Sequence, residues 1–183
     1  MPMYTLDEII KMMKPQDRRN KALIRDCIGG LGLYAAQKAY SNPGSPKIAE
    51  MRELAEQLVY YWGLDDGDNA KPVEDYLKAF DKEIDSAKAG AKVTDEKIKQ
   101  MRTSVICGLF RYGEDLVVGH GIDMIDEIQS TSDLMKEIGA EWDFDSFVLD
   151  GMTAKLNSEI KTMRENIAAA GEQPKENNGI TMS

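Results

Sequence analysis

The sequence is poor in the side chains that most catalytic and metal-binding sites use. Its 183 residues include one histidine, His120, and two cysteines, Cys27 and Cys107. With one histidine the chain cannot supply a multi-histidine metal centre, and any histidine-assisted nucleophile would depend on a residue between two glycines. Neither cysteine has a CxxC companion, and both lie in apolar, helix-periodic segments, so we expect two reduced interior thiols. These shortages favour a protein without catalysis, and we expect no cofactor.

Long apolar runs and an export signal are also missing. The longest uncharged stretch near the N-terminus lies between Asp26 and Lys38, well short of the roughly 20 residues that span a bilayer. Residues 1–14 carry acids and a helix-capping pattern, whereas a signal peptide combines a basic end with an apolar centre. We therefore expect a soluble, cytoplasmic protein that does not contact a membrane.

Chain length and composition suit one hydrophobic core. Apolar residues make up 42% of the chain and charged residues 30%, as in globular proteins and unlike disordered ones. We expect one all-α domain over residues 1–170, followed by a polar C-terminal tail at 171–183. An alternative division has two small helical lobes, 1–88 and 93–170, joined near residues 89–93, where Ala89-Gly90-Ala91 interrupts the helical pattern.

Apolar residues recur every three or four positions through most of the chain, and no segment alternates with the period of two that a strand needs. This pattern predicts an all-α bundle of six to seven helices. A short helix at Leu6–Lys14 is stopped by Pro15, and a long last helix runs from Asp143 past Ile167. The others are expected at 17–40, 46–62, 72–87, 94–116 and 122–138, with an interruption at 130–132.

Small residues form a second seam on the helix expected at 17–40. They are Gly29, Gly32, Ala36 and Ala39, spaced so that another helix backbone could approach closely. The segment 29–32 also looks like a glycine-rich phosphate loop, but no strand precedes it and no Lys-Ser or Lys-Thr pair follows. We therefore interpret the seam as a packing surface.

Charge is distributed unevenly along the chain. The net charge is −9, yet the first 25 residues carry six basic side chains against three acids, giving +3. From Gly113 to Asp150, eleven acids against one lysine give −10. The basic patch consists of Lys14, Arg18, Arg19, Lys21 and Arg25. The candidate partner-binding surface consists of Glu114, Asp115, Asp123, Asp126, Glu127, Asp133, Glu137, Glu141, Asp143 and Asp145.

So dense an acidic block predicts binding to a basic protein, because like charges repel unless a partner neutralises them. An inhibitor or decoy of a nucleic-acid-binding protein would have this character. The basic patch is small and lacks interleaved aromatics, which disfavours direct nucleic-acid binding. Two interpretations stay open beside this one. The acids could serve only solubility, or the chain could be a structural subunit of a larger assembly, viral ones included, in which the basic end of one copy meets the acidic block of the next.

A metal site is the catalytic alternative. Glu50, Glu53 and Glu56 recur on one side of the helix at 46–62, and Asp81 and Asp85 lie one turn apart on the next helix. Such pairs suit Mg²⁺. This layout resembles the all-α nucleotide pyrophosphohydrolases of the MazG type, whose paired acidic motifs bind metal, and the resemblance implies a Mg-dependent enzyme. The second acidic pair departs from the family's spacing, which puts the metal set Glu50, Glu53, Asp81 and Asp85 in doubt.

Overall fold

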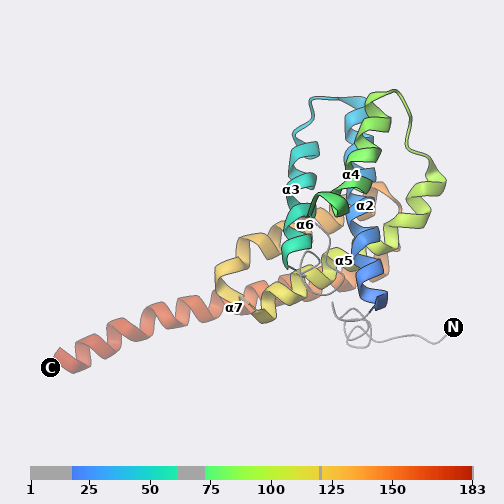
Figure 1. The fold of residues 1–183 in the computed structure, drawn as a ribbon. Helices are drawn as coiled ribbons and strands as arrows, with labels where there is room; N and C mark the ends of the chain where they lie inside the picture. Colours follow the sequence, from blue (N-terminus) through green and yellow to red (C-terminus); the bar gives the residue numbers. More distant parts are fainter. Residues whose placement is uncertain (1–17, 62–72, 120, 183) are drawn as a thin grey trace.

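The computed structural model describes residues 18–61, 73–119 and 121–182, and it is helical throughout these ranges apart from short connections (Figure 1). No strand occurs in them, which confirms the all-α prediction. The expected helix Leu6–Lys14 lies outside the described residues. The helices are α2 (Arg18–Ser41), α3 (Pro46–Tyr61), α4 (Val73–Lys88), α5 (Asp95–Gly119), the 3₁₀ turn η1 (Gly121–Met124), α6 (Ile125–Glu141) and α7 (Ser146–Met182).

Local capping signals explain where several helices begin. At α3, the hydroxyl of Ser45 accepts a hydrogen bond from the backbone N–H of Lys47 at 3.3 Å, and Pro46 occupies the first helical position. At α5, the Thr94 hydroxyl accepts one from Lys97 N–H at 3.3 Å. The two helices begin at or next to the residues expected from the sequence, 46 and 94. At the end of α4, Gly90 adopts a φ of 97°, a conformation that glycine reaches without steric cost.

The buried apolar side chains form one contiguous core drawn from all six described α-helices. Helix α2 contributes many of its fully buried members, among them Cys27, Ile28 and Leu31, because it packs against α3, α4 and α5. Helix α5 in turn packs against α6 and α7. This shared core connects the two lobes of the alternative division; whether either lobe folds alone stays a prediction. Within the described ranges, no helix has the length and apolar character needed to cross a bilayer.

The small-residue seam of α2 is a packing surface, as predicted. A Cβ atom at Gly32 would lie 2.6 Å from the Cα of Phe80 and 3.1 Å from its carbonyl oxygen, so the backbone of α4 passes directly over this glycine. Gly29 faces Ala79 of the same helix. Since residues 29–32 are buried inside a continuous helix, they do not form a phosphate-binding loop.

Two features of the second half differ from expectation. Helix α6 continues through 130–132, so the predicted interruption is wrong. The Thr131 hydroxyl donates to the Glu127 carbonyl at 2.8 Å, and the Ser132 hydroxyl donates to Asn157 of α7 at 3.2 Å, so the polar side chains are satisfied without breaking the helix. Helix α7 also continues through 171–182, the segment marked as a polar tail, and Figure 1 shows its C-terminal part extending away from the bundle.

The contact at Gly32 generates a stability prediction. Gly32→Ala should lower the free energy of unfolding by about 1–3 kcal/mol despite alanine's better helix propensity, because the added methyl group meets the backbone of Phe80. Gly151→Ala in α7 is the matched control. Gly151 is helical, exposed and faces open space, so the same change should stabilise the protein by up to ~1 kcal/mol. Urea unfolding measures both, and equal effects of the two substitutions would contradict the proposed packing.

Candidate functional site

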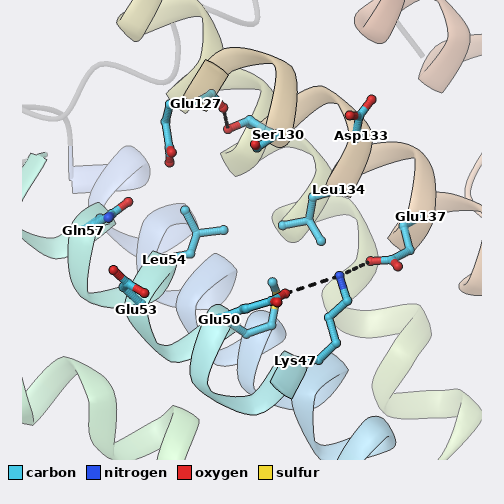
Figure 2. Close-up of a pocket in the computed structure, with 12 residues that line it drawn as sticks. Lys47, Glu50, Glu53, Leu54, Gln57, Glu127, Ser130, Asp133, Leu134 and Glu137 are labelled. Atoms are coloured by element: carbon cyan, nitrogen blue, oxygen red, sulfur yellow. Dashed lines mark hydrogen bonds and ion pairs between the residues drawn. The ribbon is translucent and has the colours of Figure 1, made fainter. Parts of the chain in front are cut away.

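A groove separates α3 from α6. Helix α3 is held by α2 and α4, whereas α6 is held by α5 and α7, and α3 and α6 are not among the closely packed helix pairs. The cavity between them has a volume of about 560 Å³. It is lined by Lys47, Glu50, Met51, Glu53, Leu54 and Gln57 of α3 and by Glu127, Ser130, Thr131, Asp133, Leu134 and Glu137 of α6. We call it the acidic groove (Figure 2).

Carboxylates dominate the charge of the acidic groove. Glu50, Glu53, Glu127, Asp133 and Glu137 contribute five negative charges against one positive charge from Lys47, a net charge of −4. The two helices supply these acids from opposite sides, and Figure 2 shows Leu54 and Leu134 between them. The groove therefore combines an anionic rim with an apolar floor.

Lys47 bridges the two walls of the groove. Its Nζ lies 3.1 Å from Glu137 Oε2 on α6 and 3.6 Å from Glu50 Oε2 on α3 (Figure 2). Burial disfavours the ionised form of Glu137, but the hydrogen bond from Lys47 and the charges of Lys47 and Lys38 outweigh it and hold the Glu137 pKa below its ordinary value. Burial is likewise outweighed at Lys47, whose pKa the two carboxylates raise. The bridge is therefore ionised at neutral pH.

The predicted partner-binding acids fall into three groups. Glu127, Asp133 and Glu137 line the acidic groove. Exposed residues elsewhere on the surface are Asp123, Asp126, Glu141, Asp143 and Asp145, of which Glu141 is paired with Lys38 at 2.7 Å. Glu114 is buried, and Asp115 is only partly exposed. The Glu114 side chain is 9% exposed and pairs with Lys155 at 3.2 Å, while Asp115 pairs with Arg111 at 3.0 Å.

The basic patch is described only in part. Lys14 lies outside the described residues, and Arg18, Arg19 and Lys21 occupy the first turn of α2, whose side chains are not described. Arg25 is exposed, and its guanidinium carbon lies 5.5 Å from the ring centroid of Tyr76. Stacking on an aromatic face is a stabilising use of an arginine that involves no nucleic acid.

The alternative metal-binding acids are not brought together. Glu50 and Glu53 face α6 across the acidic groove, whereas Asp81 of α4 accepts two hydrogen bonds from Arg52, at 3.0 and 3.2 Å. Asp85 lies one turn further along α4 and is exposed. Among the described residues, no group of three or more histidine, cysteine, aspartate or glutamate side chains is arranged to hold a metal ion.

The cysteines are poor nucleophiles in this fold. Both thiols are free, and Cys27 is completely buried with its Sγ 3.7 Å from the Val105 carbonyl oxygen. Burial raises the pKa of Cys27 far above that of an ordinary thiol and the pKa of Cys107 to about 11. Both groups are therefore protonated at neutral pH, and the protonated thiol is unreactive. His120 lies outside the described residues.

The sequence did not predict that α3 contributes to the acidic surface. It assigned Glu50 and Glu53 to a metal-site alternative, and it had no signal that their helix lies opposite α6. Comparison of the chain with protein-family models, curated proteins and solved structures gave no match. The interpretation of the site therefore depends on its geometry and charge.

The separation of the four acids predicts the response to metal. We expect millimolar Mg²⁺ to leave the melting temperature unchanged relative to NaCl of the same ionic strength, because Asp81 is already neutralised by Arg52. Differential scanning calorimetry measures this. A rise in melting temperature that Asp81→Asn abolishes would contradict the expectation and restore the metal site.

Proposed function

We propose that this chain is a non-catalytic binding protein that receives a basic segment of another protein in the acidic groove. The observation that carries the proposal is that two helices that do not pack closely together line one groove with five carboxylates and a single lysine, which pairs with two of them at one end. Repulsion among these carboxylates is relieved when a cationic partner enters, so part of the binding free energy is already stored in the free protein.

The size and floor of the groove suggest the chemistry of the partner segment. A volume of about 560 Å³ suits a few side chains rather than a folded domain. Lysine or arginine side chains would meet Glu53 and Asp133, and an apolar side chain would contact Leu54 and Leu134 at the floor. A polyanion such as nucleic acid would be repelled. The inhibitor, decoy and assembly-subunit interpretations differ in which protein contains the basic segment. In each of them the segment would bind in the acidic groove.

The reactive groups of the described residues support a non-catalytic role. The two thiols are protonated at neutral pH. The acids of the alternative metal site are separated, because Glu50 and Glu53 face the acidic groove whereas Asp81 of α4 pairs with Arg52. An enzyme needs a tuned acid, base, nucleophile or metal next to a substrate cavity. In the acidic groove, the carboxylates face one another and an ionised lysine, which favours recognition of a cation over chemistry on it.

A basic peptide tests the proposal. The probe is a fluorescent peptide of alternating lysine and leucine, and fluorescence anisotropy measures its dissociation constant at low and physiological salt. Glu50→Gln, Glu53→Gln and Asp133→Asn combined should weaken binding by about tenfold or more, because three of the five groove charges are removed. The affinity of the wild-type chain should fall as salt rises.

The matched control removes the same charge elsewhere. Glu74→Gln, Glu96→Gln and Asp150→Asn change exposed acids outside the groove lining and alter the net charge by the same three units. This variant should keep most of the wild-type affinity. Equal losses in the two triple variants would mean that the peptide responds to total charge, and the groove would then not be the binding site.

A further inference from the structure

The point at which α7 leaves the bundle is sharply defined. Ile160 is 2% exposed and is the last buried residue of α7 whose side chain is described. Beyond it, only Met163 is partly buried among residues 161–171. Figure 1 shows the helix continuing outward from here. The contacts immediately before Ile160 therefore anchor the projecting part of the helix.

A cluster of three ionisable groups lies at this anchor. Glu114 of α5 pairs with Lys155 of α7 at 3.2 Å, and the carboxyl group of Glu159, one turn further along α7, lies within hydrogen-bonding reach of Glu114. Lys155 also lies above the ring of Phe110, 5.9 Å from its centroid. The cluster therefore joins α5 and α7 through charged groups at the edge of the apolar core.

The cluster has one more acid than it has bases. Glu114 has a side chain that is 9% exposed, and its Oε1 atom is buried without a hydrogen-bond partner. The Oε2 atom of Glu159 is also buried without a partner. Two carboxylates with unsatisfied oxygens against one ammonium group need one additional proton, which would lie between them as a hydrogen bond.

The surroundings of Glu159 favour its protonated form. Burial and the adjacent Glu114 raise the pKa of Glu159 to about 7, and Lys155 opposes this rise. Among the described residues, the charged groups that act on Glu159 are Glu114 from α5 and Lys155 from α7. Helix α6 and η1, which also pack along α7, contribute none.

We propose that Glu114 and Glu159 hold one proton between them, and that loss of this proton loosens the last anchored turn of α7 from α5. With the proton present, the carboxyl groups attract each other across the helix interface. Without the proton, two negative charges face one lysine, and one negative charge stays unpaired in a partly buried interface. The attachment of the projecting helix would then respond to pH in the physiological range.

The direction of the effect follows from linkage. Glu159 binds its proton more tightly in the folded protein than in the unfolded chain. Its contribution to stability is therefore fully present below the ordinary glutamate range and is lost as pH rises through about 7. Glu159→Gln, which mimics the protonated side chain, should match the wild-type protein at low pH. Above pH 7 it should melt a few degrees higher, roughly 2–4 °C.

Carboxyl carbon NMR of the full chain tests the shared proton without interference from the histidine. We expect one glutamate to titrate with a midpoint near 7, and this titration should vanish in Glu159→Gln and move to lower pH in Glu114→Gln. Glu165→Gln, which removes an exposed acid from the same helix, should leave it unchanged. A titration curve in which all glutamates have midpoints below about 5.5 would overturn the proposal.

Hydrogen exchange tests the consequence for the helix. After correction for the intrinsic pH dependence, amides at 156–163 should open more readily at pH 8 than at pH 6 in the wild-type protein and equally at both values in Glu159→Gln. Equal protection at both pH values in the wild-type protein would reject the loosening of α7 even if the proton is present. Neither experiment involves the acidic groove, so failure here and failure of the proposed function are separate results.

Discussion

At Gly32 the backbone of α4 lies against α2 with no side chain between them, and this close contact fixes how α2 and α4 pack. Helix α2 packs against α3, α4 and α5, and α5 packs in turn against α6 and α7. The positions of α3 and α6 are thus set mainly by packing against their separate neighbours, and the Lys47–Glu137 ion pair connects them at one end of the groove. The acidic groove is a product of this arrangement: the acids that line it would repel one another if the two helices closed.

Local features were predictable from the sequence because they depend on neighbouring residues. The helices capped by Ser45 and Thr94 begin close to the expected residues 46 and 94, and Gly32 accepts the backbone of a second helix as expected. The interruption expected at 130–132 did not occur because Ser132 finds a partner on α7, a contact between residues distant in sequence. The position of Glu53 across the groove from α6 was missed for the same reason, since helical periodicity gives the buried face of a helix but not the identity of the helix opposite.

The acidic residues illustrate how little a charge count says about individual groups. Asp133 is exposed, Glu137 is ionised against Lys47, and Glu114 is buried against Lys155. Burial and neighbouring charge decide among these states, and both come from tertiary structure. Periodicity alone placed Glu114 on the surface because the apolar stripe of its helix does not reveal that α7 covers the adjacent face.

Lys47 lies at one end of the acidic groove and already supplies a cation to Glu137 (Figure 2). An incoming ammonium or guanidinium group must exchange places with this resident lysine at Glu137, so that contact adds little net free energy. In the proposed complex, the gain in binding free energy would be concentrated at Glu53 and Asp133, whose carboxylates are exposed to solvent. If the groove binds a basic segment as proposed, a resident competitor of this kind would favour rapid exchange and a short residence time, as in reversible capture rather than in a permanent complex.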